Sequence, residues 1–315
     1  MTTQLILSDE LWWHVFEWLP PLELLQSVSK TSRYLQNLLR ESYWRVQCAK
    51  LLANNNPLDL VLLQDPRLLP SDFALNQRQL KRLCLILYQN KKTPWKQAAK
   101  LPQSLRETSL LRKSNTSSKA QMSAFCWASS TYMNCFIENI LPTLPSSNNR
   151  RNRVFIKRWW CSAPDRNPNS SETFLFGFND LAAISKIKLK HLIDPYKSNQ
   201  SFTWKETQVK AYRVPQGRLS MMTYCSASSS SSNAEVLLLL RDVEPIYQTP
   251  RIPTQAVVEP GQASTEHETI YLSENSVVLT NLVAIQLYGK NTMMSTPGEG
   301  YCVCVDEIDI SGVVL

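Results

Sequence analysis

Residues 172–192 read ETFLFGFNDLAAISKIKLKHL, and their pattern decides the fold class of the larger part of the chain. The second half alternates between two sets of side chains, Ile184, Lys186, Lys188 and Lys190 against Ile187, Leu189 and Leu192. Successive side chains of a strand point to opposite faces, so this spacing predicts a half-buried strand over 184–192. The first half, 172–178, is another apolar run of strand length, and we expect two strands in this stretch.

Similar runs, rich in β-branched and aromatic residues, recur on both sides of this stretch, at 154–160, 207–214, 235–240, 277–287 and 301–310. Turn-rich segments separate them, and the serine-rich segment 226–233 is expected to be a flexible loop. No helical pattern is evident between them. Several short strands of this kind predict an antiparallel sandwich or jelly roll over residues 122–315.

The first 90 residues have a helical pattern instead. Apolar residues recur at helical spacing from Leu5 to Leu52, which fits three short helices. Ser8 is expected to cap the first helix, and Pro20 and Pro21 to end it. A further amphipathic helix is expected over 77–88.

The predicted fold class is therefore α+β, with a helical part followed by an antiparallel β-sandwich. Residues 91–121 are basic and polar, which predicts a linker between the two parts. The expected organisation has four parts: a helical module at 1–52, a helical extension at 53–90, the linker at 91–121 and a β-sandwich recognition domain at 122–315.

Composition limits the classes of protein that this chain can belong to. Of its 315 residues, 43% are hydrophobic, which is enough for one large core or two modest ones. The formal charge is +8, but the basic residues are scattered, which favours a solvated surface over a nucleic-acid site. No apolar run approaches the roughly 18 residues that a membrane span needs, so no membrane partner is expected.

The eight cysteines lie far apart, and charged residues interrupt the apolar opening of the chain. We therefore expect an intracellular protein, cytoplasmic or nuclear or both, with reduced thiols. Cys302 and Cys304 would share one strand face, but no second cysteine pair or histidine cluster completes a zinc site. They are expected to be buried strand cysteines.

No motif nominates a catalytic, metal or cofactor site. His14, His191 and His267 lie in three separate contexts, and no glycine-rich phosphate loop is present. The acidic group Asp306, Glu307 and Asp309 is expected to be a solvated strand face, although an acid/base or calcium site is conceivable. Basic and aromatic residues interleave at Lys157, Arg158 and Trp159, beside the stripe Lys186, Lys188 and Lys190, yet nucleic acid remains a minor alternative.

Near the N-terminus, several short pieces together resemble the F-box: Leu7-Ser8-Asp9-Glu10-Leu11, Val15-Phe16, Leu19-Pro20, Val28-Ser29-Lys30 and Tyr43-Trp44. The resemblance implies a three-helix unit that binds a Skp-family adaptor and, through it, the cullin of an SCF ubiquitin ligase. It implies an adaptor-binding set made up of Leu7, Glu10, Leu11, Val15, Phe16, Leu19, Pro20 and Leu24. Val28, Lys30 and Trp44 would stabilise the unit.

The sequence departs from the F-box pattern in three places. Ser8 stands where proline is usual, Ser32 or Tyr34 stands where tryptophan is common, and the stretch 21–28 is short. The register of the second helix is therefore open. An amphipathic helical unit with a small core of its own would fit the same spacing.

Pieces of the later sequence resemble a plant F-box subfamily whose C-terminal domain has a discoidin-like, galactose-binding-type fold. They are Ala128–Thr131, Arg158–Ser162, Glu172–Phe176, Leu282–Gly289 and Tyr301–Gly312. Trp159 and Trp160 are adjacent, so a strand would point one ring inward and the other outward. An outward ring could stack on a sugar or a partner side chain, but packing in the core or at its rim is the favoured interpretation.

These features together predict a non-enzymatic, substrate-recognition adaptor of an SCF-type E3 ubiquitin ligase, without cofactors. Its β-domain would bind an unidentified protein substrate, with or without glycans. The alternative is a glycan- or glycoprotein-binding module, for which Trp159 and Trp160 are the candidate ligand-binding residues. A hydrolytic enzyme would need a nucleophile, a base and oxyanion donors in one pocket, and the sequence shows no such group.

Overall fold

The computed structural model describes residues 8–52, 63, 73–92, 108–111, 123–132, 135–142, 159–193, 201–202, 204–227, 233–254, 268–272, 277–290, 292–294 and 300–315. The chain divides into two compact units. The first comprises residues 1–106, 275–277 and 315, and the second comprises 107–274 and 278–314. No helix among the described residues is long and apolar enough to cross a membrane.

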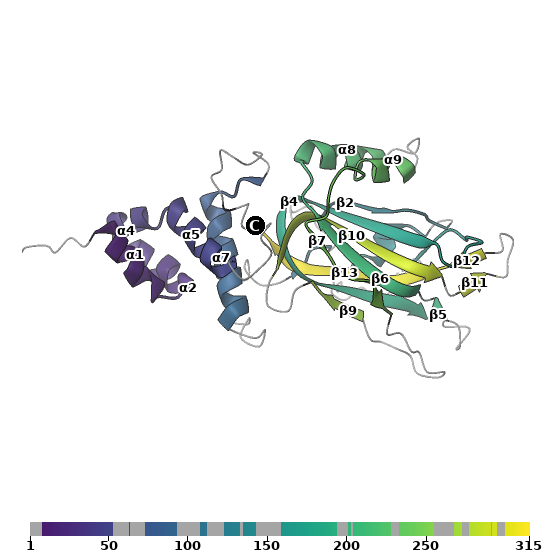
Figure 1. Cartoon of the computed structure of the whole chain (residues 1–315), viewed down its shortest axis with the longest axis horizontal. Helices are drawn as coiled ribbons and strands as arrows, with labels where there is room; N and C mark the ends of the chain where they lie inside the picture. The colour runs from purple at the N-terminus through teal and green to yellow at the C-terminus, as the bar shows by residue number, and fades with distance from the viewer. Residues whose placement is uncertain are drawn as a thin grey trace, which may run out of the picture. The chain divides into compact units, whose positions relative to one another are not determined.

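The first unit is helical (Figure 1). Its elements are α1 (Asp9–Glu17), α2 (Pro21–Glu23), the π-helical turn η1 (Leu24–Val28), α3 (Ser29–Thr31), α4 (Arg33–Leu38), α5 (Glu41–Leu52) and α7 (Gln77–Lys92). The predicted cap is confirmed, because the Ser8 hydroxyl accepts a hydrogen bond from the Leu11 N–H. The helix expected over 77–88 is also confirmed, whereas most of the remaining extension, 53–62 and 64–72, lies outside the described residues.

The predicted three helices between Leu5 and Leu52 are divided further. Ser32 has an extended backbone, so α3 ends at Thr31. The Ser32 hydroxyl then accepts a hydrogen bond from the Leu35 N–H at 3.1 Å and caps α4. A serine that bonds to the backbone ahead of it starts a new helix rather than continuing the old one, which spacing of apolar residues alone did not reveal.

Aromatic side chains form the centre of the helical core. Trp44 is completely buried, and its indole Nε1–H donates to the Leu39 carbonyl at 3.0 Å. The Tyr43 ring packs edge-on against both Trp44 and Phe16. The buried indole therefore keeps its hydrogen bond, which removes the main cost of burying a tryptophan.

The second unit is built around β4 (Ser171–Ile193), a single strand of 23 residues. It covers both of the strands predicted in this stretch. The expected break lies near Asn179 and Asp180, which are exposed where the register with β10 (Val278–Lys290) shifts between Thr280 and Leu282. The chain accommodates these two polar residues as an irregularity within the strand and does not turn there.

Neighbours of β4 change along its length (Figure 1). The half before Ile184 pairs with β10 and with β2 (Ser123–Ala128). The half after Ala182 pairs with β13 (Cys304–Val314) and with β9 (Glu268–Tyr271). All these pairings are antiparallel, which confirms the predicted antiparallel β architecture of this part of the chain.

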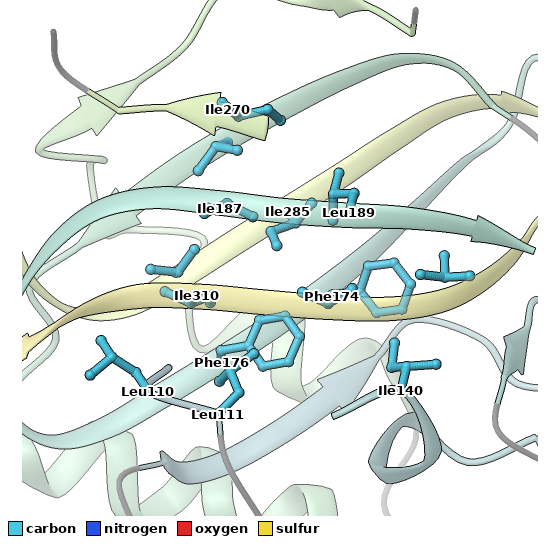
Figure 2. Packing of buried hydrophobic residues seen from close by; sticks show 14 of the residues in the cluster. Leu110, Leu111, Ile140, Phe174, Phe176, Ile187, Leu189, Ile270, Ile285 and Ile310 are labelled. Atoms are coloured by element: carbon cyan, nitrogen blue, oxygen red, sulfur yellow. The ribbon is translucent and has the colours of Figure 1, made fainter. Parts of the chain in front are cut away.

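The remaining strands are β1 (Thr108–Ser109), β3 (Trp160–Cys161), β5 (Ser201–Phe202), β6 (Trp204–Tyr212), β7 (Tyr247–Gln248), β8 (Ile252–Pro253), β11 (Thr292–Met294) and β12 (Gly300–Cys302), and the short helix is η6 (Ile137–Ile140). The main sheet has the order β1-β13-β4-β10-β6-β7, with the other strands paired off this path, while β11 and β12 form a separate two-stranded sheet. Figure 2 shows the main core, in which Phe174, Phe176, Ile187, Leu189, Ile285 and Ile310 come from β4, β10 and β13.

One predicted strand is wrong. Residues 235–240 are not a strand, because helix α9 (Asn233–Leu238) occupies most of them, and α8 (Gln216–Ala227) precedes it. Val236 is buried in a second core beneath these helices, whereas Leu237 and Leu238 are exposed. A short apolar run does not distinguish a strand from one helical turn, and the expectation that no helices interrupt the strands fails for the same reason. Most of the expected loop, 228–232, lies outside the described residues.

The predicted linker at 91–121 also differs from the structure where residues are described. Thr108 and Ser109 pair with Gly312 and Ser311 of β13, and Leu110 and Leu111 are buried in the main core. A segment of four residues is too short to show a strand period, and the β13 residues that pair with it lie about two hundred positions later in the chain. Local sequence therefore did not predict this strand. Most of the linker is outside the described residues, as are residues 154–158 of the strand predicted over 154–160.

The lysine stripe of β4 confirms the predicted alternation, with two exceptions. Ile187 and Leu189 are buried, as is His191, and the lysines between them are half-buried. Leu192, predicted on the face of Ile187 and Leu189, is half-buried like the lysines, and Ile184, predicted on the lysine face, is fully buried. The register with β13 shifts between Ser311, which pairs with Lys186, and Gly312, which pairs with Ile184. β4 is therefore irregular at Ser185, and the residues before it point to the opposite face from the one that strict alternation predicts.

Candidate functional site

An apolar strip on α1 is the most exposed hydrophobic feature of the helical unit. Leu11, Val15 and Trp18, the C-cap residue of α1, are 51%, 42% and 89% exposed, at spacings of four and three residues. Such spacing places them on one helix face, while Phe16, on the other side, is buried in the core. We call these three residues the α1 strip.

Polar groups lie next to the α1 strip. Lys50 forms an ion pair with Glu17, and His14 lies 3.7 Å from the same carboxylate. The hydrogen bond from Lys50 lowers the pKa of Glu17. At the start of α1, the Tyr34 hydroxyl donates to Asp9 at 2.8 Å. An apolar centre with a charged rim is the usual anatomy of a protein-binding surface.

The residues that the F-box resemblance nominated divide into three groups. Leu11 and Val15 are exposed on the α1 strip, Phe16 and Leu24 are buried in the core, and Leu19 and Pro20 are half-buried. The Glu10 backbone lies in α1, but its side chain is outside the described residues, as is all of Leu7. Sequence reasoning missed Trp18, although its spacing from Val15 could have identified it.

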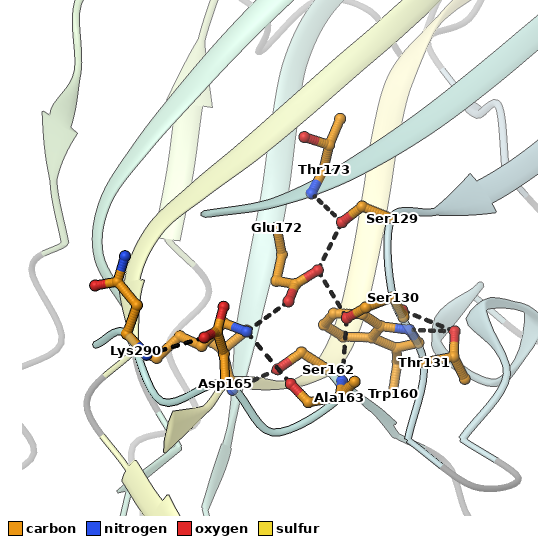
Figure 3. Close-up of polar contacts among 12 residues, drawn as sticks. Ser129, Ser130, Thr131, Trp160, Ser162, Ala163, Asp165, Glu172, Thr173 and Lys290 are labelled. Atoms are coloured by element: carbon orange, nitrogen blue, oxygen red, sulfur yellow. Dashed lines mark hydrogen bonds and ion pairs between the residues drawn. The ribbon is translucent and has the colours of Figure 1, made fainter. Parts of the chain in front are cut away.

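In the β unit, Glu172 is the centre of a buried polar network (Figure 3). Its Oε1 lies 2.7 Å from the Lys290 Nζ, and both side chains are almost completely buried. Its Oε2 accepts hydrogen bonds from the Ser129 and Ser130 hydroxyls at 2.6 and 2.8 Å. A buried carboxylate needs such partners, because burial of an unpaired charge is costly.

The network extends from Glu172 through the backbone on both sides. The Thr173 N–H donates to the Ser129 Oγ at 2.9 Å, and the Ala163 N–H donates to the Ser130 Oγ at 3.0 Å. The Trp160 indole N–H donates to the Thr131 Oγ1 at 3.3 Å. Gly289, at a φ of 74°, lies in a left-handed conformation immediately before Lys290.

Five motif pieces that carried the second resemblance therefore meet in space. Residues 128–131, 160–163 and 172–174 are joined directly through the network, β10 brings Lys290 to it, and β13 pairs with β3. Their hydroxyl and carboxylate groups are satisfied by one another, so this network holds the β unit together.

The adjacent residues Trp159 and Trp160 differ in burial, as the sequence predicted. Trp160 is completely buried and packs edge-on against Phe174 at 4.6 Å between ring centroids. Trp159 is half-buried and packs against a cluster of cysteines. Of the two candidate ligand-binding residues, only Trp159 keeps part of its surface accessible.

The cysteine cluster contains Cys135, Cys161, Cys302 and Cys304. Cys161 and Cys304 form a disulfide, which corrects the expectation that all the thiols are reduced. The two residues face each other across the β3–β13 pair with a Cα–Cα distance of 4.2 Å, so their thiols meet. Among the described residues, no group of three or more His, Cys, Asp or Glu is arranged to hold a metal ion.

A second buried titratable group lies where β4, β6 and β9 meet. His191 stacks on Trp204, with ring centroids 4.0 Å apart, and its Nε2 lies 3.8 Å from the Glu268 Oε2. Neither ring nitrogen and neither carboxylate oxygen has a hydrogen-bond partner. Burial raises the pKa of Glu268 to about 7 and lowers the pKa of His191 to about 4. At neutral pH the histidine is therefore uncharged.

Acidic residues of β13 lie opposite the lysine stripe. Lys188 faces Asp309 and Lys190 faces Glu307 across the strand pair. Lys190 also forms an ion pair with Asp306 at 2.6 Å. The acidic group is half-buried beside cations, which differs from the solvated face that the sequence suggested. Opposite charges across strands stabilise the sheet and offset the positive potential that a nucleic acid would need.

Comparison with known proteins gives only distant similarities. No protein-family model matches the chain, and no curated protein matches it. The family 32 CBM of C. perfringens NanJ, solved in complex with galactose, is similar with a TM-score of 0.35 and 10% identity, over 65% of this chain and 98% of that one. A structure of the Streptococcus pneumoniae β-galactosidase BgaA is similar with a TM-score of 0.36 and 13% identity, over 64% of this chain and 97% of that one.

A Streptococcus pneumoniae fucose-binding module is similar at a TM-score of 0.31 and 10% identity, over 59% of this chain and 91% of that one. The similar structures thus include a fucose-binding module and family 32 CBMs. At this degree of similarity, neither their ligands nor their assemblies transfer to this chain. The F-box assignment of the helical unit stays a prediction.

Proposed function

We propose that the chain is a non-catalytic adaptor of an SCF-type ubiquitin ligase. Its helical unit binds a Skp-family adaptor and thereby cullin, and its β unit binds a protein substrate inside the cell. The observation that carries the proposal is the α1 strip, an exposed apolar face on a helix whose opposite side already fills the core.

Energetics favour a protein partner for the α1 strip. Burying a valine or leucine side chain gains about 1.5–3 kcal/mol relative to leaving it in water. Trp18 exposes a larger apolar area, and tryptophans are enriched among the residues that dominate binding energy. The ion pairs next to the strip stay at the rim, where they would select a partner rather than add affinity.

In this proposal the chain performs no chemistry itself. An adaptor acts by holding the substrate near the enzyme that transfers ubiquitin, and this gain in local concentration replaces catalytic groups. The described part of the β unit fits such a role, because its Ser129, Ser130 and Glu172 side chains are committed to the buried network.

The direct test measures binding of the purified chain to a recombinant Skp-family adaptor. Val15 and Val46 are matched for comparison, since both are helical valines that are 42% exposed, on α1 and α5. Val15→Asp places a carboxylate in the proposed interface and is expected to raise the Kd by more than about tenfold. Val46→Asp adds the same charge elsewhere and is expected to leave the Kd nearly unchanged.

Two outcomes count against the adaptor role. If the folded wild-type chain does not bind the adaptor, the helical unit is an ordinary small core. If both substitutions weaken binding equally, charge rather than the α1 strip determines the contact. Circular dichroism of each variant separates lost binding from lost folding. Phe16 is unsuitable as a test position, because it is buried and its replacement would disturb the core.

A glycan- or glycoprotein-binding role of the β unit is the second candidate. The observation that favours it is the partly accessible ring of Trp159 beside the buried Trp160. Titration with galactose or fucose would give a saturable change in tryptophan fluorescence, which Trp159→Ala removes and Trp18→Ala retains. No change with the wild-type chain would leave protein recognition as the only role.

A further inference from the structure

The short strand β3 is held to the sheet by few backbone contacts. It has only two residues, which pair as Cys161 with Cys304 and Trp160 with Val305 of β13. The disulfide adds a covalent link at this same place and joins residues 143 positions apart. A two-residue strand has little stability of its own, so the covalent link is a large part of what fixes it.

Several groups depend on the position of β3. Trp160 fills the main core and donates to Thr131. Ser162, two residues after Trp160, forms two hydrogen bonds with the Val303 backbone. Its N–H donates to the Val303 carbonyl at 2.9 Å, and its Oγ accepts from the Val303 N–H at 3.1 Å. Ala163 then connects to Ser130 and so to the Glu172 network. Release of β3 would loosen each of these contacts.

Two further thiols lie in the same buried cluster as the disulfide. Cys135 and Cys302 are both free and buried. The Tyr132 N–H donates to the Cys161 carbonyl at 2.9 Å, and the Cys135 N–H donates to the Tyr132 carbonyl, which ties the Cys135 segment to β3. Four sulfur-bearing side chains from three separate parts of the chain thus lie within one core.

We propose that Cys135, Cys161, Cys302 and Cys304 form a redox-sensitive clasp, which fixes β3 and the Trp159–Ala163 segment when Cys161 and Cys304 are joined and releases them when the bond is reduced. The reductant is a dithiol. One of its thiolates attacks a sulfur of the disulfide, its second thiol resolves the mixed disulfide, and the products are two protein thiols and one oxidised dithiol.

Burial keeps the closed clasp from rearranging by itself. Because the thiolate is the attacking species, a raised thiol pKa suppresses exchange at neutral pH. Burial raises the pKa of Cys302 to about 11, so this neighbour is protonated while the cluster stays closed. Exposure of the segment removes that protection from the Cys302 thiol.

Such a clasp has a regulatory meaning in a reducing compartment. Disulfides in intracellular proteins are usually transient or redox-sensing rather than permanent. The released segment includes Trp159, the half-buried aromatic residue at this edge of the β unit. The clasp lies entirely in the β unit and does not depend on adaptor binding.

The test compares the full chain under oxidising conditions and after treatment with dithiothreitol. Alkylation of the unfolded protein is expected to label six thiols in the oxidised form and all eight in the reduced form. Limited chymotrypsin digestion then reports locally on β3. Cleavage after Trp159 or Trp160 is expected to be at least about tenfold faster in the reduced form, since opening limits cleavage.

Variants give the matched controls. Cys304→Ser is expected to be cleaved at the fast rate under both conditions, and its melting temperature is expected to lie roughly 5–15 °C below that of the oxidised wild type. Cys225→Ser removes a thiol on α8, outside the cluster, and is expected to keep the full response to reductant. If Cys304→Ser does not fold, the reduced wild type and Cys161→Ser provide the same comparison.

Three results overturn the clasp. The first is eight labelled thiols in the protein purified under oxidising conditions, because the bond would then not form. The second is a cleavage rate at Trp159 and Trp160 that reduction leaves unchanged. The third is release of β3 in Cys225→Ser, under oxidising conditions, as complete as in Cys304→Ser, since the effect would then not belong to the cluster.

Discussion

Lys290 and Glu172 show, at the scale of single residues, how a buried charge is retained in the β unit. The carboxylate has one cation, Lys290, and two hydroxyl donors, the adjacent Ser129 and Ser130, so its partners come from two distant parts of the chain. Sequence analysis identified the Ala128–Thr131 and Glu172–Phe176 pieces, but it could not pair them, because nothing local records which distant residue neutralises Glu172.

Removing one partner of this pair is expected to be costly. Lys290→Met leaves Glu172 buried without its cation and is expected to lower the free energy of unfolding by about 3–5 kcal/mol in urea titrations. Adding Glu172→Gln to that variant is expected to recover part of the loss, which a double-mutant cycle measures. The control is Lys190→Met, which breaks the more exposed pair with Asp306 and should cost no more than about 1 kcal/mol. Equal losses in the two single variants would contradict the structural role.

The contributions of His191 and Glu268 to the pH dependence of the free energy of unfolding are expected to cancel over part of the pH range. Glu268 has a folded-state pKa raised to about 7, so it stabilises the fold at low pH and loses that contribution as pH rises through 7. His191 has a folded-state pKa lowered to about 4, so its contribution is present above its unfolded pKa and is lost as pH falls through 4. Between their ordinary pKa values, about 4.5 and 6.5, the two slopes have opposite signs and cancel.

Replacing either residue alone is expected to expose the pH dependence that the other one gives to the free energy of unfolding. In Glu268→Gln only the histidine titrates, so the free energy of unfolding should rise with pH between about 4 and 6.5. In His191→Phe only the carboxyl titrates, so it should fall with pH between about 4.5 and 7. Urea titrations at several pH values measure both slopes. Parallel pH profiles for the wild type and the two variants would show that the pair is not titrating.

At the scale of elements, the sequence predicted secondary structure best in segments long enough to show a helical or strand period. The helix over 77–92 and the alternating half of β4 are of this kind. The errors fell on short segments that are defined by tertiary contacts. Most of the run 235–240 forms a helix over a second core, and Thr108–Ser109 form a strand because they pair with the edge of β13. In both cases distant partners overrode a weak local pattern.

Close packing between strands predicts a sharp difference between two glycines. A Cβ on Gly312 would lie 2.4 Å from the Ala183 carbonyl oxygen, a backbone atom that cannot rotate away. Gly312→Ala is therefore expected to force β13 and β4 apart and to destabilise the β unit by about 1–3 kcal/mol. A Cβ on Gly217 in α8 would meet nothing within 4 Å, so Gly217→Ala should leave stability unchanged or slightly higher. Thermal unfolding of the two variants checks this order, and equal melting temperatures would refute it.

At the scale of the whole molecule, the sequence predicted a helical part and an antiparallel β part, and the structure has both. The candidate docking residues were predicted less well. Leu11 and Val15 are exposed as a partner-binding role requires, whereas Phe16 and Leu24 belong to the core, and Trp18 was overlooked. Helical spacing assigns residues to faces but does not state which face a neighbouring helix covers.

Two compact units are expected to unfold in two steps. Trp44 is completely buried in the helical core, and Trp44→Ala is expected to destabilise that unit by about 3–5 kcal/mol. Amide hydrogen exchange followed by mass spectrometry should show faster exchange in α5 and α7, while β4 and β10 keep their protection. Loss of protection in both units at once would show that they unfold as one.

The length of β4 also affects how the protein is made. Its two main partners, β10 and β13, begin 85 and 111 residues after β4 ends at Ile193. At a ribosomal rate of about 5–20 residues per second, β4 waits on the order of ten seconds before both edges can be paired. Throughout that interval β4 lacks both of these partners, and β2, which precedes it in the chain, can pair only with its first half. Aggregation competes with folding at such unpaired strand edges, so the newly made chain is expected to be prone to aggregation until β13 has been translated.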